Sequence, residues 1–358
     1  MGKLDETLQR IGKLDAEAMA AAAERQDRLS KPKGALGVLE IISIKVAGIL
    51  GEPIPEPGAK TVIVMAADHG VVEEGVSLYP AEVTAQMVHN FLSGGAAINV
   101  LSRHVGANVT VVDVGVASDL AGEGLVVKKI APGTANMALG PAMSREQAVA
   151  AIEAGIEVAE AEISHGARFL ATGDMGIGNT TAASAITACL SGLDPLEVTG
   201  RGTGIDDAGL DLKRRVISEA LRVNCPDKND ALDVLAKVGG LEIAGIAGVI
   251  LAAAAAKCPV VIDGFISAAG ALVAAGLHEG APAFMIASHL SVERGHGVIL
   301  ERLGLCPIIH AEMRLGEGTG AALAFSFIDA ALKVLREMAT FDEAGVSGPE
   351  DALEKTQC

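Results

Sequence analysis

The sequence predicts an α/β protein built around a doubly wound, mainly parallel sheet. Short apolar runs alternate with longer helical stretches over most of the 358 residues, and this alternation is typical of a parallel sheet covered by helices on both faces. Three glycine-rich loops stand next to these stretches. If they follow the strands, they lie at the carboxyl edge of the sheet, where ligands of this fold class bind.

Apolar periodicity indicates the elements in order. Helices are expected at residues 12–26 and 36–50, before a strand at residues 60–67 that ends in Asp68-His69-Gly70. Further strands are expected at residues 108–115, 168–172, 259–263, 282–288 and 307–313, and further helices at residues 81–89, 144–165, 206–224, 240–257 and 319–337. The apolar run 241–277 contains Glu242, Lys257 and Asp263, which favours a buried helix, strand and helix over a membrane span.

The two ends of the chain lie outside this alternation. We therefore expect residues 51–337 to form a large α/β domain. Residues 1–50 and 338–358 would supply the two segments of a small helical domain.

The stretch Ala171-Thr-Gly-Asp-Met-Gly-Ile-Gly-Asn-Thr-Thr181 reads as the end of a strand, a cradle and the start of a helix. Its glycines permit backbone conformations closed to other residues, and Asn179 and Thr180 can cap free N–H groups. A helix start of this kind attracts an anion, above all a phosphate. A turn without a ligand is the alternative, because one glycine motif is weak evidence.

Two more glycine-rich loops also precede helices. Together the three loops favour a ligand site over turns without a ligand. The loop 200–207 precedes a helix that carries Lys213, and the loop Arg314-Leu-Gly-Glu-Gly-Thr-Gly320 precedes another helix. In the last of these, Glu317 stands between glycines, so no adjacent side chain can pair with it. A carboxylate in that position suits a general base.

Several long motifs carry a family resemblance. TGDMGIGNTT, GRGTGID and RLGEGTGAA, together with ADHGVVEEGVSLYP, GGLEIAGIAG, DGFISAAGAL and SVERGH, resemble the nicotinate-nucleotide:dimethylbenzimidazole phosphoribosyltransferases of cobalamin synthesis. The resemblance runs along nearly the whole chain. It implies a Rossmann-like large domain with a small helical domain from the chain ends, a homodimer, and no metal or cofactor.

The resemblance also implies site residues. Glu317 would be catalytic, and the phosphoribosyl or nucleotide moiety would be bound by Asp174, Gly176, Ile177, Gly178, Asn179, Thr180, Gly202, Gly204, Lys213, Ser291, Arg314 and Gly316. The aromatic base would be bound by Ser77, Tyr79, Pro80, Gln86, Met87, Met175 and Leu315. From the sequence alone, Lys213 reads as a surface lysine, and the segment around Tyr79 reads as an ordinary loop and amphipathic helix.

Two positions depart from the family pattern. Asp174 stands where the family commonly has a glutamate, so its carboxylate sits one methylene further back. Arg294, just after Ser291 and Glu293, stands where the family commonly has a proline, which affects the expected shape of that loop.

Charge and motif content argue against several classes of function. The net charge of −17 disfavours nucleic acid and acidic membrane surfaces as partners. A GxGxxG fingerprint after the first strand is missing, which disfavours a dinucleotide. Asp68-His69 invites a metal, but the histidines lack metal-binding spacing, so a turn with a satisfied hydrogen bond is favoured. Five scattered cysteines and a polar N-terminus predict a cytoplasmic protein without a disulfide framework.

The expected reaction is transfer of the 5-phosphoribosyl group from nicotinate mononucleotide to 5,6-dimethylbenzimidazole, as the resemblance implies. A related enzyme that prefers a purine, another benzimidazole or a phenol is the main alternative. A non-catalytic sensor of a nucleotide or base is a third hypothesis, which the intact Glu317 disfavours.

Overall fold

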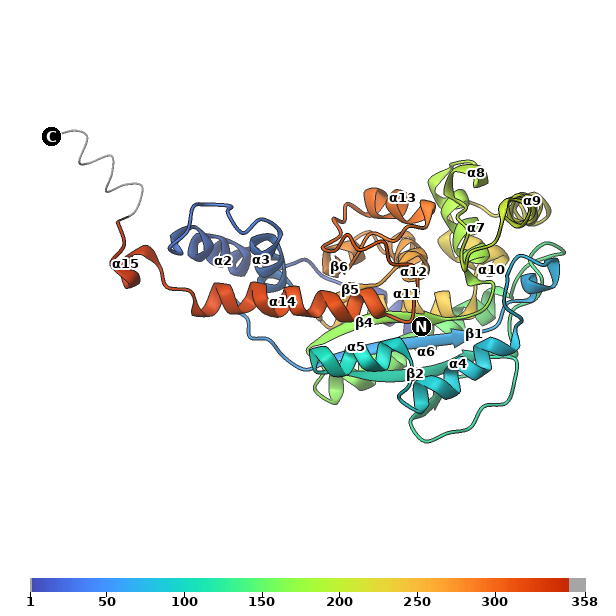
Figure 1. Cartoon of the computed structure of the whole chain (residues 1–358), viewed down its shortest axis with the longest axis horizontal. Coiled ribbons are helices and arrows are strands. Elements are labelled where there is room, and N and C mark those ends of the chain that lie inside the picture. Colours follow the sequence, from blue (N-terminus) through green and yellow to red (C-terminus); the bar gives the residue numbers. More distant parts are fainter. Residues whose placement is uncertain (1, 348–358) are drawn as a thin grey trace. The chain divides into compact units, whose positions relative to one another are not determined.

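The structure is a computed structural model that describes residues 2–347. Its centre is a sheet of six strands in the order β3-β2-β1-β4-β5-β6, with all five neighbouring pairs parallel (Figure 1). The strands are β1 (Lys60–Ala67), β2 (Ala107–Gly115), β3 (Leu125–Val127), β4 (Phe169–Met175), β5 (Val260–Ile262) and β6 (Met285–Ala287). This order is that of a doubly wound Rossmann-like sheet, so the predicted fold class is confirmed.

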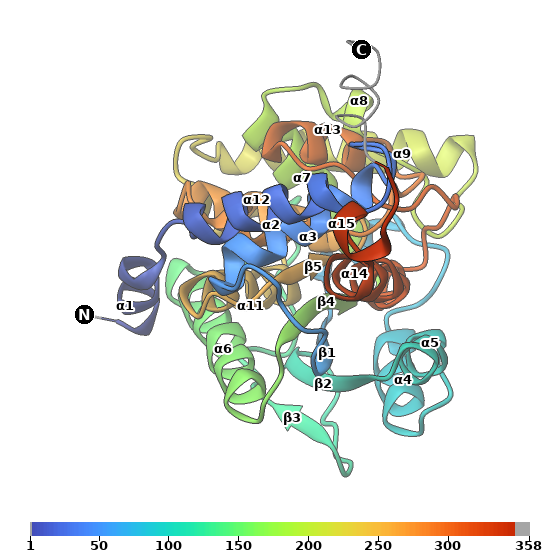
Figure 2. The ribbon, with the colours of Figure 1, turned by 90° about the vertical axis from the view of Figure 1, so that its left-hand side faces the viewer.

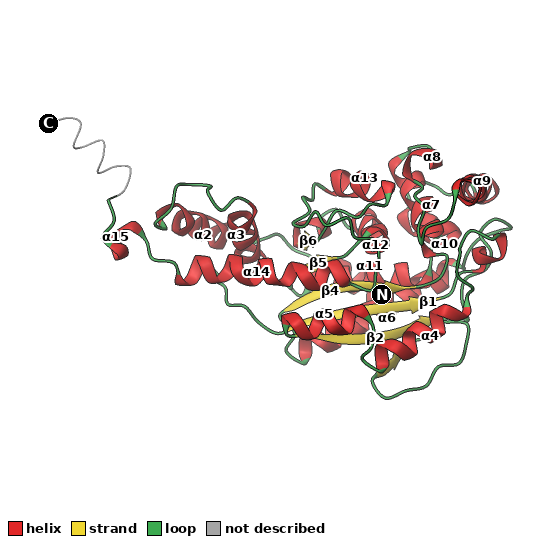
Figure 3. Ribbon diagram, viewed as in Figure 1, coloured by secondary structure: helices red, strands yellow, loops and turns green. Residues whose placement is uncertain are grey.

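Helices make up most of the remaining regular structure (Figure 3). They are α1 (Lys3–Arg10), α2 (Ala16–Arg28), α3 (Val38–Leu50), α4 (Glu82–Leu92), α5 (Ala97–Val105), α6 (Arg145–Ser164), α7 (Asn179–Ser191), α8 (Pro195–Val198), α9 (Asp207–Asn224), α10 (Ala231–Val238), α11 (Leu241–Ala255), α12 (Phe265–Leu277), α13 (Arg294–Leu303), α14 (Thr319–Glu337) and α15 (Phe341–Ala344). Short 3-10 turns occur at η1 (Gly70–Glu74) and η2 (Ala281–Phe284).

Helices cover both faces of the sheet, because the strands β1, β4, β5 and β6 are buried along their length and need apolar cover on two sides. Figure 2 shows α6 and α11 on one side and α4 and α5 on the other. The pair α6 and α11 approaches closely: a Cβ atom at Gly248 would lie 1.9 Å from the carbonyl oxygen of Ile152. Glycine at this crossing lets the two backbones touch.

The chain divides into two compact units. Within the described residues, the large unit comprises residues 2–12 and 59–324, and the small unit comprises residues 13–58 and 325–347. The predicted domain limits at residues 50 and 338 stay a prediction, and residues 348–358 of the predicted C-terminal segment lie outside the described residues. Among the helices of the described part, none combines the length and the hydropathy that crossing a membrane requires.

The predicted strand at residues 307–313 is wrong. The segment makes only an isolated bridge, between Ile309 and His289, and Leu290 donates to the carbonyl of Ile309 at 2.9 Å. Its backbone partners are Ala287, the last residue of β6, and residues of the loop that follows, so the segment adds no strand to the sheet. After this segment the chain returns to the edge of the sheet where Arg314 and Glu317 line a cavity.

Candidate active site

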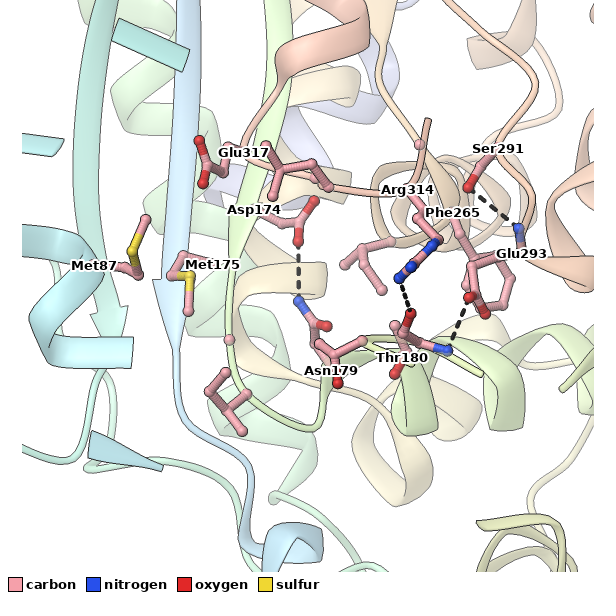
Figure 4. A pocket seen from close by; sticks show the side chains of 18 of the residues that line it. Met87, Asp174, Met175, Asn179, Thr180, Phe265, Ser291, Glu293, Arg314 and Glu317 are labelled. Atoms are coloured by element: carbon pink, nitrogen blue, oxygen red, sulfur yellow. Dashed lines mark hydrogen bonds between the residues drawn. The ribbon is translucent and has the colours of Figure 1, made fainter. Parts of the chain in front are cut away.

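A cavity of about 380 Å³ opens at the carboxyl ends of β4, β5 and β6 (Figure 4). Three loops that follow these strands contribute to its lining, and the loop before α14 closes it with residues 314–317. The chain reverses its winding between β1 and β4, and crevices at such switch points bind ligands in this fold class. The three glycine-rich loops of the sequence analysis all reach this cavity.

The loop after β4 turns at the predicted glycines, but the predicted capping of α7 by Asn179 and Thr180 is wrong. No side chain caps this helix, because the Asn179 amide donates to Asp174 and the Thr180 hydroxyl accepts from Lys213.

Gly178 adopts the left-handed conformation with φ of 92° and is the N-cap of the 13-residue helix α7. The N–H groups of Asn179 and Thr181 donate to the carbonyls of Gly176 and Gly178 at 3.1 and 2.9 Å, so the loop offers an anion mainly the positive end of the helix dipole. The Ile177 N–H donates to the buried Thr84 hydroxyl at 3.1 Å, so α4 fixes the loop. The helix start therefore offers a rigid site for an anion.

Lys213 adds a cation to the cradle, although the sequence reads as if it were a surface lysine. Its residue is 1% exposed, and its ammonium donates to the Thr180 hydroxyl at 2.6 Å. Burial lowers the pKa of Lys213 to about 8, against the opposing charge of Glu293. Glu293 itself accepts from the N–H of Gly202 at 2.8 Å, and its second oxygen has no hydrogen-bond partner among the described residues. The ammonium is thus held by the Thr180 hydroxyl and lies next to Gly202, where an added Cβ atom would be 3.2 Å from it.

Arg314 brings the third loop to the same place. Its guanidinium donates to the carbonyl of Gly202 at 3.1 Å, and it lines the cavity (Figure 4). Two loops more than 100 positions apart in the sequence are thereby joined beside Thr180. Both local cations, Lys213 and Arg314, offset the repulsion that a net charge of −17 exerts on an anion.

Glu317 lies in the cavity wall in an unusual backbone conformation. Its φ is 62°, and its neighbours Gly316 and Gly318 also have positive φ. A non-glycine residue in this region is strained, and such strain gathers at functional sites. One carboxylate oxygen accepts from the N–H of Ile98 at 3.2 Å, at the start of α5. Burial raises the pKa of Glu317 above its ordinary value, while this hydrogen bond opposes the rise.

Asp263 holds the loop that carries Glu317. Its two oxygens accept from the N–H of Gly318 at 3.2 Å and from the N–H of Ala321 at 2.9 Å. Burial raises the pKa of Asp263 to about 7, against these backbone hydrogen bonds. The carboxyl group therefore caps α14 and fixes the position of the adjacent Glu317.

Asp174 stands at the end of β4 with one oxygen bound and one open. Its Oδ2 accepts from the Asn179 amide at 3.0 Å (Figure 4), while its buried Oδ1 lacks a hydrogen-bond partner in the described part of the chain. Burial, reinforced by the negative charges of Asp263 and Glu242, raises the pKa of Asp174 well above its ordinary value. A buried polar atom in a cavity wall is ready to bond a ligand.

Apolar side chains form the wall beside Glu317. Met87 and Met175 lie together on this side of the cavity in Figure 4, and Tyr79, Val83 and Ile177 also line it. Methionine and aromatic side chains suit a flat apolar ring. The cavity thus combines a polar, cationic end with an apolar one.

The structure brings most of the predicted site residues together. Those that line the cavity are Tyr79, Met87, Asp174, Met175, Gly176, Ile177, Asn179, Thr180, Gly202, Ser291, Arg314, Leu315, Gly316 and Glu317. Six predicted residues do not line it: Ser77, Pro80, Gln86, Gly178, Gly204 and Lys213. Of these, Gly178 supports the cradle as the start of α7, and Lys213 reaches it through Thr180.

Several lining residues were not predicted from the sequence, namely Val83, Thr203, Gly264, Phe265, Ile266 and His289. Gly264 to Ile266 directly follow the strand predicted at residues 259–263, so the rule that ligands bind beyond strand ends could have found them. His289 follows β6 in the same way. Its Nδ1 lies 3.0 Å from the Ser288 hydroxyl, and burial lowers its pKa to about 4, so the ring is neutral near pH 7.

The side chains of Asp68 and His69 make hydrogen bonds within the protein. The His69 ring is hydrogen-bonded to Glu242 at 2.7 Å, and Asp68 accepts from the N–H of Ala117 at 2.8 Å. These bonds agree with the interpretation of the motif as a hydrogen-bonded turn, while the second oxygen of Asp68 is buried without a hydrogen-bond partner among the described residues.

Known proteins are similar to the chain along nearly its whole length. A family model described as "Phosphoribosyltransferase" matches residues 11–346. The nicotinate-nucleotide–dimethylbenzimidazole phosphoribosyltransferase of Desulforudis audaxviator is 60% identical over 97% of this chain and 99% of its own, and that of Chloroflexus aggregans is 60% identical over 98% and 100%. A crystal structure of the enzyme of the same name from Thermus thermophilus superimposes with a TM-score of 0.89 at 49% identity, covering 94% of this chain and 100% of that one.

Proposed function

The chain belongs to the family of nicotinate-nucleotide–dimethylbenzimidazole phosphoribosyltransferases, and from this premise we propose how its site performs the transfer. The enzyme moves the 5-phosphoribosyl group of nicotinate mononucleotide to 5,6-dimethylbenzimidazole. The products are nicotinate and α-ribazole 5′-phosphate, which supplies the nucleotide loop and lower ligand of cobalamin.

The 5′-phosphate binds at the start of α7, between the Gly176–Thr180 loop and the Gly202 loop. The positive end of the α7 dipole and the buried ammonium of Lys213 supply the positive potential. Arg314 and Ser291 line the same end of the cavity. Holding the phosphate there fixes the ribose C1′ relative to the acceptor, and such positioning contributes several kcal/mol to catalysis.

The acceptor base lies against the apolar wall of Tyr79, Met87 and Met175, with Leu315 at the same cavity. Ser77, Pro80 and Gln86 belong to the segment that carries Tyr79. Ser77 shapes that segment, because its hydroxyl accepts from the N–H of Tyr79 at 3.2 Å. The base is therefore held close to Glu317.

The departing nicotinate needs no acid. Its ring nitrogen is cationic while bonded to C1′, and the electron pair of the breaking C1′–N bond neutralises it. One benzimidazole nitrogen forms the new bond to C1′ from the opposite face, which inverts the centre from β to α. The second nitrogen carries an N–H that becomes acidic as the first nitrogen bonds.

Glu317 accepts that proton. The observation that carries this role is a buried carboxylate in the cavity wall, with one oxygen fixed by the N–H of Ile98 and its backbone held in a strained conformation. A positioned base typically contributes about 10²–10⁴ in rate. Asp174, whose free oxygen lies in the same wall, binds the ribose or the base.

The test is incubation of the purified protein with nicotinate mononucleotide and 5,6-dimethylbenzimidazole, without added metal. Chromatography should show nicotinate and α-ribazole 5′-phosphate in equal amounts. A panel with a purine, an unsubstituted benzimidazole and a phenol in place of the acceptor ranks the bases. Nicotinate release without ribazole phosphate, or no consumption of the nucleotide by folded protein, would contradict the proposed transfer.

We also propose that the chain acts as a cytoplasmic homodimer. The family resemblance supports the dimer, and the four free cysteines among the described residues agree with a reducing compartment. Equilibrium sedimentation at micromolar concentration should give twice the mass of 36.2 kDa. A single monomeric species would contradict the dimer.

A further inference from the structure

A buried ionisable pair, His69 and Glu242, lies directly behind the proposed phosphate cradle and has no part in the chemistry above. The ring Nε2 of His69 is 2.7 Å from Oε1 of Glu242, and the two side chains are 1% and 0% exposed. His69 follows β1, and Glu242 is the second residue of α11. The second oxygen of Glu242 has no hydrogen-bond partner within residues 2–347.

Glycines surround the pair and bring the cradle onto it. A Cβ atom at Gly176 would lie 3.3 Å from Nε2 of His69, and one at Gly178 would lie 3.4 Å from its Cβ. A Cβ atom at Gly240 would lie 2.4 Å from the ring of His69 and 2.6 Å from the free oxygen of Glu242. The loop Gly176–Gly178 thus packs on the imidazole. Larger residues at positions 176 and 178 would push the loop away from the imidazole, and a larger residue at position 240 would collide with His69 and Glu242.

The charges that face His69 come from two elements. Glu242 faces it from α11, and Asp68 faces it from the end of β1. The residues 176–179 of the cradle, which lie on its other side, are uncharged. Asp174, at the end of β4, interacts with Glu242 across the same region. When His69 is protonated, its positive charge lies behind the cradle and is balanced by the carboxylates of Glu242 and Asp68.

We propose that His69 and Glu242 form a positioning pair for the phosphate of the nucleotide. The pair supports the backbone of the Gly176–Gly178 loop from behind, and the protonated imidazole stabilises the bound phosphate dianion through the thin layer of glycine backbone. Its role rests on the phosphate site proposed above. The pair touches neither the ribose nor the acceptor, so it acts on binding and not on the proton transfer to Glu317.

This arrangement couples nucleotide binding to the protonation of His69. Burial alone would lower the pKa of His69, but Glu242 and Asp68 raise it above its ordinary value. A dianion bound on the other side of the loop raises it further, so nucleotide binding takes up part of a proton at pH values near and above the pKa of His69. Affinity for the nucleotide accordingly falls as the pH rises through that pKa.

The experiment compares Glu242→Gln and His69→Gln with the wild-type chain. Each variant keeps a side chain able to hydrogen-bond its partner, but Glu242→Gln removes the carboxylate and His69→Gln removes the titrating ring. The control is Asp113→Asn, which alters a buried carboxylate at the end of neighbouring β2 that holds the N–H of Val116 at 2.8 Å. Thermal unfolding reports the cost of each change to folding.

Two measurements distinguish positioning from a purely structural role. Steady-state kinetics at pH 7.5 should give a KM for nicotinate mononucleotide about 5- to 10-fold higher in both variants, with kcat and the KM of the acceptor within about 2-fold of wild type. Calorimetric titration with the nucleotide, in buffers of different ionisation enthalpy between pH 6.5 and 9, gives the proton uptake. The uptake of wild type minus that of His69→Gln isolates His69, because Lys213 and the phosphate titrate in both proteins.

Unchanged nucleotide KM and equal proton uptake in folded variants would overturn the positioning role. The positioning role would also be overturned if His69→Gln and Glu242→Gln lost kcat and thermal stability to the same extent as Asp113→Asn while their KM for the nucleotide stayed unchanged. If the wild-type chain itself neither binds the nucleotide nor transfers its ribosyl group, the proposed function fails instead, which separates the two outcomes.

Discussion

At the scale of single residues, the proposed transfer depends most on Glu317. Replacing it with Gln keeps the hydrogen bond to Ile98 available but removes the proton acceptor. We expect kcat to fall about 10²–10⁴-fold, with both KM values changed little, because the proton moves only in the transition state. The matched control is Glu312→Gln, an exposed glutamate of the same loop that also has positive φ. Equal turnover by the two variants would remove Glu317 from its role as base.

The raised pKa of Glu317 predicts the acid limb of the pH profile. Burial raises the pKa above the ordinary value of 4.5, and only the ionised carboxylate accepts a proton. Therefore kcat should fall as the pH drops through that raised pKa, at a higher pH than an exposed glutamate would give. Single-turnover rates from pH 4.5 to 8 measure this limb. Glu317→Gln should lose it, and an unchanged limb in the variant would assign it to another group.

Lys213 gives a third prediction at this scale. Lys213→Met removes the buried ammonium that donates to Thr180, and charged hydrogen bonds contribute about 1.5–3 kcal/mol. The KM for nicotinate mononucleotide should rise about 10- to 100-fold with a smaller change in kcat. Because the pKa of Lys213 is lowered to about 8, the gap between wild type and variant should narrow above pH 8. Arg215→Met, an exposed cation on the same helix, should leave the KM unchanged at every pH.

At the scale of elements, β4 and the loop that carries Glu317 are in direct backbone contact. A Cβ atom at Gly173 would lie 2.4 Å from the carbonyl oxygen of Glu317 and 3.0 Å from the nitrogen of Gly318. Gly173→Ala must push the loop away, so we expect a loss of about 1–3 kcal/mol in the free energy of unfolding and a lower kcat. Gly297→Ala, within α13, meets nothing within 4 Å and should stabilise by about 0.5–1 kcal/mol.

Denaturant unfolding and steady-state kinetics on these two variants check the contact. Full kcat in Gly173→Ala would show that the position of Glu317 tolerates a shift of the loop, and it would weaken the case for a precisely held base. Equal unfolding free energies in the two variants would show that the strand absorbs the extra methyl group.

The elements of the site were predictable to the extent that local chemistry marks them. Glycines marked the loop around Gly178, although the expected side-chain caps at Asn179 and Thr180 are not formed. An isolated carboxylate between glycines marked Glu317. The burial of Lys213 was not predictable, because the helix that carries it also bears exposed Arg215 and nothing local shows which face meets Thr180. Phe265 and His289 follow ordinary strands, and only the convergence of β5 and β6 on one cavity makes them site residues.

At the scale of the whole molecule, alternation of strands and helices was enough to predict a parallel doubly wound sheet, because each such unit must bury its strand between helices. The strand order was not predictable from it, since pairing depends on contacts remote in the sequence. β3 is only three residues long, too short for a periodic signal. The apolar run at residues 307–313 has the pattern of a strand, yet it pairs with the loop after β6. The sequence does not show whether such a run will pair with a strand or with a loop.

The net charge gives the last prediction, which concerns approach of the substrate. A chain with 45 acidic and 28 basic residues repels a phosphate dianion at long range, whereas Lys213 and the start of α7 attract it only at contact. Raising the ionic strength from about 0.01 to 0.15 M shortens the Debye length from about 30 to 8 Å. This screens the remote repulsion more than the buried contacts, so kcat/KM for nicotinate mononucleotide should rise several-fold.

The uncharged 5,6-dimethylbenzimidazole is the internal control, and its kcat/KM at saturating nucleotide should stay constant. A fall of the nucleotide value with salt would mean that local cations, and not the net charge, govern its approach.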